Sequence, residues 1–227
     1  MKKLSLLFVL LFSCQCFAND NKLFDESWLA TATSEDVITE IEKNKNLDLK
    51  KENEYGRTPL MGAAEANNAE AVKVLLEYGS DVHQKSPPPS PMSAIAWLSK
   101  GAEMNLGYHI YPYQSSKSKK EVLELLINYG ADINEENTNG FTPLHIAIQT
   151  SDEEAISFLL RKGARLSSPF TPNKEVFAIE DEINSLKKQM LFLEKNGGVV
   201  KPIDNTVNML KEYQKSLIEE YQKTLAE

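Results

Sequence analysis

The sequence predicts an all-α fold, a solenoid of short helical hairpins, and two observations support this. The first is an internal repeat: residues 56–84, "GRTPLMGAAEANNAEAVKVLLEYGSDVHQ", align without a gap with residues 140–168, "GFTPLHIAIQTSDEEAISFLLRKGARLSS". The second is the pattern within each copy, where an N-cap and a proline begin one helix and a glycine ends the next. A split third copy lies between them, in residues 90–99 and 121–137.

Each copy contains the start of one helix and the end of another. A hydroxyl residue caps the first helix, and proline follows at the first helical position, where a missing N–H costs nothing. The second helix has the apolar spacing of a buried stripe, and a glycine ends it as a left-handed C-cap. The capping pairs are Thr58–Pro59, Ser90–Pro91 and Thr142–Pro143, and the glycines are Gly79, Gly130 and Gly163.

These residues resemble the ankyrin-repeat family, in which "TPLH" precedes an apolar pair and then "GAD(V/I)N". The likeness is strongest in "TPLHIA" and "NYGADIN". It implies an ankyrin-repeat solenoid whose hairpin fingers and inner helices form a concave surface that binds proteins. It also implies that His145 is structural and joins adjacent repeats by hydrogen bonds.

The middle repeat carries an insertion rich in tyrosine. The cap and the glycine are 21 residues apart in 58–79 and in 142–163, but 40 apart in 90–130, so 19 extra residues fall at about 101–119. A repeat tolerates such length because loop-closure entropy grows slowly. The rings either form a contact patch, since tyrosine is enriched at binding hot spots, or fold the insertion over its own repeat.

The fingers supply further candidates for binding. Residues 51–57 and 134–141 each carry two glutamates, which predicts a partner with a basic surface, and residues 85–91 form a stiff, proline-rich tip. Trp97 aligns with Glu65 and Gln149, and it is either an exposed anchor or the floor beneath the insertion. The predicted partner-binding set is Tyr55, Arg57, Lys85, Trp97, Tyr108, His109, Tyr111, Tyr113, Glu135, Glu136, Phe141 and Gln149.

The first eighteen residues have the pattern of a secretory signal peptide. Two lysines precede a short apolar run, and the segment ends in small or polar residues. Cleavage after Ala18 gives a free periplasmic protein, whereas lipidation at Cys14 in "LFSC" anchors it to the envelope. Phe12 is bulky for a lipidation motif, which favours the free form. Contact with a membrane is expected only if Cys14 is lipidated.

Four parts follow along the chain: a signal peptide (1–18), an N-terminal capping repeat (19–53), ankyrin repeats (54–168) and a C-terminal helical cap (169–227). In the last part, Asp204 or Asn205 is expected to cap the second of two helices. Each helix has one apolar stripe, which either covers the open end of the solenoid or forms a dimerising coiled-coil seam. The stripes are Val176, Ile179, Ile183, Leu186, Met190 and Leu193, then Val207, Leu210, Tyr213, Leu217, Tyr221 and Leu225.

Composition and motifs limit the possible functions of the protein. The net charge of −8 becomes −10 without the leader (23 basic against 33 acidic residues), which disfavours nucleic acid. No G-x-S-x-G, H-E-x-x-H or Walker motif is present, so we expect no catalysis, cofactor or metal. We expect an exported bacterial protein, monomeric when unbound, that blocks a toxin as an immunity protein. The alternatives are an accessory protein for a periplasmic enzyme and an envelope enzyme with its site in the insertion.

Overall fold

A computed structural model describes residues 21–44, 47–89, 91–105, 118–166 and 171–226. In these residues every regular element is a helix, which confirms the all-α prediction. The elements are η1 (Lys22–Phe24), α1 (Glu26–Leu29), α2 (Ser34–Lys43), α3 (Pro59–Glu65), α4 (Ala69–Glu77), α5 (Ala94–Asn105), α6 (Lys120–Asn128), α7 (Pro143–Gln149), α8 (Glu153–Arg161), α9 (Pro172–Lys195) and α10 (Lys201–Ala226).

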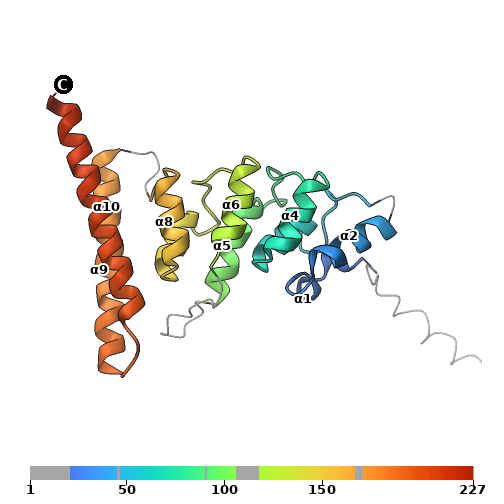
Figure 1. The fold of residues 1–227 in the computed structure, drawn as a ribbon, viewed down its shortest axis with the longest axis horizontal. Helices are drawn as coiled ribbons and strands as arrows, with labels where there is room; N and C mark the ends of the chain where they lie inside the picture. Colours follow the sequence, from blue (N-terminus) through green and yellow to red (C-terminus); the bar gives the residue numbers. More distant parts are fainter. Residues whose placement is uncertain (1–20, 45–46, 90, 106–117, 167–170, 227) are drawn as a thin grey trace, which may run out of the picture.

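The helices stand in a row, with α1 and α2 at one end and the hairpin of α9 and α10 at the other (Figure 1). The inner helices α3, α5 and α7 pack on one another, and the outer helices α4, α6 and α8 form a second layer beside α2. A continuous apolar core runs between the layers. The predicted stripes lie in it, and Leu75, Leu126 and Leu159 are fully buried. The predicted solenoid of helical hairpins is therefore confirmed.

Local capping matches the sequence in the first and last repeats. The hydroxyls of Thr58 and Thr142 accept the backbone N–H three residues ahead, and proline occupies the first turn of α3 and α7. Gly79, Gly130 and Gly163 have φ values of +91°, +100° and +83°. An L-residue rarely adopts these angles, so glycine is required where each outer helix ends.

The middle repeat begins three residues later than predicted. Helix α5 starts at Ala94, and the N–H of Trp97 bonds to the carbonyl of Ser93, so Ser93 rather than Ser90 is the N-terminal cap. The N–H of Ser86 bonds to the carbonyl of Met92 at 3.0 Å, which closes the finger. The matching bonds in the other fingers join residues 53 and 57 and residues 137 and 141, both at 2.9 Å.

This shift corrects two expectations. The bond that closes this finger joins residues six positions apart (86 and 92), whereas the bond in the first finger joins residues four apart (53 and 57). The middle finger is therefore two residues longer. The cap-to-glycine distance becomes 37 residues (93–130) instead of 40, and the insertion is 16 residues rather than 19. Trp97 then aligns with Gly62 and Ile146, not with Glu65 and Gln149. The reason is that Ser-Pro suits a turn as well as a helix start.

Helices α9 and α10 form the predicted hairpin cap, and α10 lies against α8. The apolar stripes of the two helices meet inside the hairpin, so those side chains are not available to join a second chain. The buried members of the predicted stripes are Ile179, Ile183, Leu186, Leu193, Val207, Leu210 and Leu217, and Ile203 is buried with them. Helix α10 begins at Lys201 rather than at Asp204 or Asn205, because Pro202 fits a first turn and the N–H of Asp204 already bonds to Val200.

Candidate protein-binding surface

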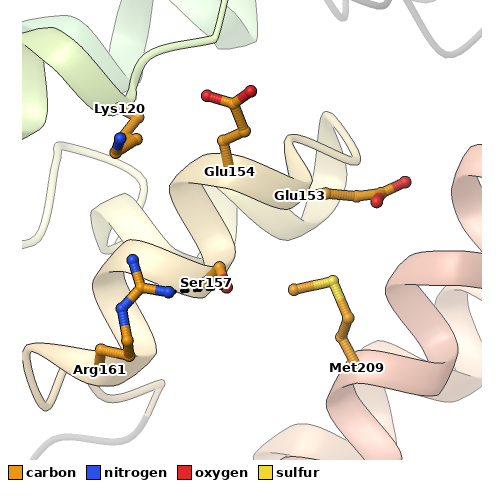
Figure 2. A pocket seen from close by; sticks show the side chains of 6 residues that line it. All are labelled: Lys120, Glu153, Glu154, Ser157, Arg161 and Met209. Carbon is orange, nitrogen blue, oxygen red and sulfur yellow. Dashed lines mark hydrogen bonds between the residues drawn. The ribbon is translucent and has the colours of Figure 1, made fainter.

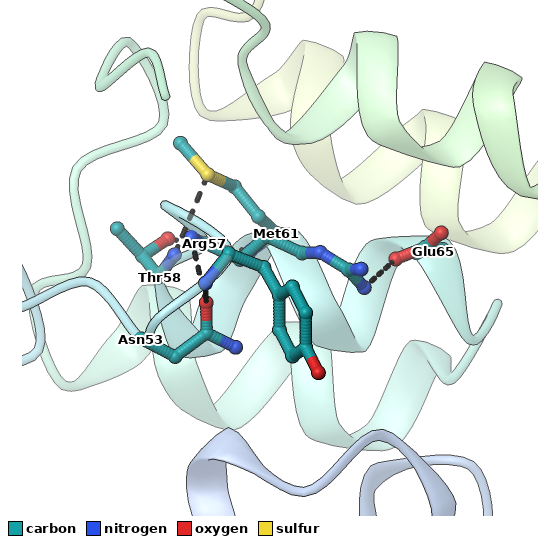
Figure 3. A network of polar contacts seen from close by, with 6 residues as sticks. Asn53, Arg57, Thr58, Met61 and Glu65 are labelled. Carbon is teal, nitrogen blue, oxygen red and sulfur yellow. Dashed lines mark hydrogen bonds and ion pairs between the residues drawn. The ribbon is translucent and has the colours of Figure 1, made fainter. Parts of the chain in front are cut away.

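The finger at residues 51–57 is held in a tight turn. The side-chain oxygen of Asn53 accepts the N–H groups of Tyr55 and Arg57, each at 3.0 Å. Gly56 has φ +73°, and an added Cβ would lie 2.7 Å from Pro87 in the next finger. Figure 3 shows Asn53 below the backbone of this turn and Arg57 leading toward α3. The turn therefore fixes where the side chains of Tyr55 and Arg57 project.

Arg57 lies between two aromatic rings and pairs with an acid. Its guanidinium carbon is 5.5 Å from the centre of the Tyr55 ring and 4.6 Å from that of Trp97, within the range of a cation–π interaction. The guanidinium also forms an ion pair with Glu65 at the end of α3 (Figure 3). The side chains of Arg57 and Glu65 are only 14% and 13% exposed. The phenol of Tyr55, 66% exposed, lies at the surface of this cluster.

Trp97 is buried, and the interpretation of an exposed anchor is wrong. It is 5% exposed and packs in a small cluster with Met61, Met92 and Ala96. Its effect on the surface is indirect, because its ring contacts the Arg57 guanidinium. Glu65 was missed as part of this site. The signal that could have found Glu65 is that it is the only charged residue in the short helix 59–65, whose other residues are small or apolar.

A second polar cluster joins two fingers. The Lys85 ammonium is 3.2 Å from Glu135, and the N–H and hydroxyl of Ser93 also donate to the Glu135 carboxylate. The Glu135 side chain is 11% exposed, so it braces α5 and has little surface left for a partner. Lys85 stays about half exposed and Glu136 is exposed. We call the exposed Tyr55, Lys85 and Glu136, together with the largely buried Arg57–Glu65 pair beside Tyr55, the finger face.

The last inner helix contributes a ring pair. Phe141 and His145 have ring centres 5.7 Å apart, and Gln149 is partly exposed at the end of α7. The Nδ1 atom of His145 accepts the N–H of Thr142 at 3.1 Å, which completes a capping box. Its position is thus that of a residue that stabilises a helix start. Burial lowers the pKa of His145, and the nearby Glu175 carboxylate opposes that change.

We expect His145 to make stability depend on pH. Its folded pKa lies below the ordinary value of 6.5, so the unfolded chain takes up the proton first as pH falls. The unfolding free energy should therefore drop as the solution is taken from about pH 7.5 to about pH 5. His145→Gln keeps a side-chain acceptor and should flatten that part of the curve, as measured by urea unfolding. Parallel curves for the two proteins over this range would contradict the assignment.

The remaining predicted site residues lie outside the described residues. These are Tyr108, His109, Tyr111 and Tyr113 in the insertion and Cys14 in the leader. Their roles stay predictions. In the part of the chain that the structure describes, no three metal-ligating side chains come together, and no helix is both long and apolar enough to span a bilayer.

An open groove lies between α8 and the hairpin, on the other side of the last repeat. Lys120, Glu153, Glu154, Ser157, Arg161 and Met209 line a hollow of about 510 Å³ (Figure 2). Two of its groups are already engaged: Asn205 donates to Glu153 at 2.8 Å, and Arg161 donates to Ser157 at 3.2 Å. The mixture of charges and the openness of the groove point to no ligand class, so the finger face is the better candidate.

Comparison with known proteins identifies the repeats. A family model for "Ankyrin repeats (3 copies)" matches residues 2–86, and one for "Ankyrin repeats (many copies)" matches residues 111–160. A Borreliella burgdorferi protein named "Putative ankyrin repeat protein" is 28% identical over 178 residues, which cover 73% of this chain and 81% of the relative.

Two longer relatives match through smaller parts of their length. A human protein, transient receptor potential cation channel subfamily A member 1, is 26% identical over 139 residues, 58% of this chain and 11% of the channel subunit. A fowlpox virus protein named "Putative ankyrin repeat protein FPV219" is 30% identical over 122 residues, 48% of this chain and 28% of the viral protein. The chain thus belongs to the ankyrin-repeat family, whose repeats are protein–protein interaction modules.

Proposed function

We propose that this protein is exported to the periplasm and binds an envelope-acting toxin or effector through the finger face, covering the active site of that partner. The observation that carries the proposal is the exposed Tyr55 phenol above an Arg57 side chain that is already held in place. Tyrosine offers a large contact area at low entropic cost, and a preordered surface loses less entropy on binding.

Charge supports a basic partner. The chain has a net charge of −8, and the first finger carries two glutamates, Glu52 and Glu54. Glu54 and Glu136 are both exposed on the fingers, where they can attract a positively charged surface. Such attraction raises the rate of association and disfavours acidic competitors. The leader-like first eighteen residues support export, and export would place the protein where toxins delivered into the envelope act.

The proposal predicts a large effect of Tyr55→Ala on binding. The partner is first captured with the purified protein from envelope and secreted fractions, identified by mass spectrometry and purified. Tyr55→Ala should then raise Kd at least about tenfold, as expected for a hot-spot residue. Tyr129→Ala is the matched control, because Tyr129 is an exposed tyrosine at the end of the outer helix α6.

The two variants and an activity assay separate the outcomes. Both variants should fold as the wild type does, because both rings are exposed. An equal Kd for Tyr55→Ala and wild type would exclude the finger face as the binding site. The partner should lose its activity when mixed with the wild-type protein. A partner that stays active in the complex would instead make this protein an accessory subunit and overturn the inhibitor proposal.

A further inference from the structure

The outer face of α9 exposes two large apolar side chains. Phe177 is 71% exposed and Leu191 is 58% exposed, whereas the opposite stripe of the same helix is buried against α10. The two residues are 14 positions apart, just under four helical turns, so they lie on one stripe and about 21 Å from each other. Two large apolar side chains on one exposed helix face offer a partner two separate points of apolar contact.

The residues between them carry charge in a fixed order. The acidic pair 180–181 (Glu-Asp) follows Phe177 by about one turn, and the basic pair 187–188 (Lys-Lys) precedes Leu191 by about one turn. All four charged side chains are exposed, and Asn184 stands at the midpoint. If the helix is reversed about Asn184, the basic pair takes the place of the acidic pair, and Leu191 takes the place of Phe177.

We propose that α9 pairs antiparallel with α9 of a second copy of this chain, about a twofold axis at Asn184. In that arrangement Phe177 of one copy lies near Leu191 of the other, and each acidic pair faces a basic pair. A parallel arrangement would set like charges against each other, which costs free energy. A twofold axis makes both contacts occur twice, as in most soluble dimers.

This dimer differs from the coiled-coil seam considered for the sequence. That seam used the stripes that are now buried between α9 and α10, whereas the present one uses the opposite side of α9. Pairing two hairpins in this way makes a four-helix arrangement. The hairpin lies at the far end of the row from α1 and α2 (Figure 1), so two copies joined there leave the first fingers uncovered. The inference replaces the expected monomer and does not rest on the proposed function.

The area available is small, so the dimer should depend on concentration. The stripe from Phe177 to Leu191 spans fewer than four turns, and interfaces well under about 1,000 Å² are typically weak. The measurement is sedimentation equilibrium of the purified protein over a wide concentration range, in reducing buffer so that Cys14 and Cys16 cannot link copies. The wild type should approach twice the monomer mass as concentration rises. A monomer throughout would overturn the proposal.

A substitution on the stripe tests the surface. Leu191→Lys should keep the protein monomeric over the whole range, and circular dichroism should show unchanged helix content because Leu191 is exposed. Tyr129→Lys is the matched control, because it places a lysine at another exposed apolar position, just after α6, and it should leave the dimer intact. A dimer that survives Leu191→Lys forms through another surface and overturns the proposal.

A charge exchange tests the antiparallel arrangement. Asp181 and Lys188 are seven residues apart on one side of the stripe, too far to pair within their own helix but placed to meet across the twofold axis. Lys188→Asp alone should weaken dimerisation at least about tenfold, and Asp181→Lys with Lys188→Asp should restore it. Failure of the double variant to restore the dimer would overturn the antiparallel pairing.

Discussion

Arg57→Met is expected to lower the unfolding free energy by about 3 kcal/mol, because it removes the Arg57 cation from the largely buried Glu65 carboxylate. The same change removes the guanidinium between the rings of Tyr55 and Trp97, which costs packing as well as charge. Urea unfolding followed by circular dichroism measures the difference. The slope of the transition should stay close to that of the wild type, since the fold is kept.

A second variant separates the ion pair from the packing. Arg57→Met together with Glu65→Leu removes both charges and should recover most of the lost stability, because apolar groups of similar size often replace a buried ion pair at no cost. Arg57→Lys keeps the charge but loses the flat guanidinium that fits between two rings, so it should fall between wild type and Arg57→Met. If Arg57→Met were as stable as wild type, the pair would not hold the first finger to α3.

Asn68→Asp is expected to destabilise the protein by about as much, roughly 3 kcal/mol, although the two side chains have nearly the same shape. The Asn68 amide donates to the carbonyls of Leu29 at 2.7 Å and Ala32 at 2.8 Å, and its oxygen caps α4 by accepting the N–H of Ala71. An aspartate keeps the cap but cannot donate, and it places a negative charge beside two buried carbonyl oxygens. Urea unfolding measures the loss.

Asp152 occupies the position in the last repeat that is equivalent to Asn68, so the opposite exchange, Asp152→Asn, serves as a control. Asp152 caps α8, and its carboxylate accepts the hydroxyl of Ser118 and the N–H of Lys119, both at 2.8 Å. Asp152→Asn should therefore also destabilise the protein, because the new side-chain NH2 group would face a donor such as the N–H of Lys119. Burial lowers the pKa of Lys119, and Asp152 opposes this, so the loss of the acid should lower that pKa further. Equal tolerance of both exchanges would show that the caps do not join neighbouring repeats.

Much of the fold follows from local pattern. Thr58–Pro59 and Thr142–Pro143 predict the starts of α3 and α7 because an N-cap and proline act within one turn, and the structure shows both. The apolar stripes of the hairpin were likewise read from helical spacing. The helix start predicted at Ser90–Pro91 is wrong, because α5 begins at Ala94 after the finger bond between Ser86 and Met92. Local pattern could not show this, since Ser-Pro suits a turn as well as a helix start.

The candidate site depended more on contacts between repeats. Tyr55 and Arg57 were predicted from the finger, and they do lie together. Glu65 was not predicted, and the sequence left open whether Trp97 is exposed or buried, since both depend on how α3 and α5 pack. Glu135 was expected at the surface as an acidic contact, but Ser93 and Lys85 engage it. An ion pair between residues far apart in the chain leaves no periodic trace in the sequence.

The sequence by itself determined the repeat, the helix caps, the glycines that end the outer helices and the hairpin at the end of the row. These depend on interactions within a few residues, which spacing and residue type record. The tertiary structure alone decided which side chains are buried or bound internally and which face outward, as with the buried Trp97, the ion-paired Glu135 and the exposed Phe177 and Leu191. The physical reason is that exposure is a property of packed neighbours, and a repeat of similar segments does not say how far each side chain is covered.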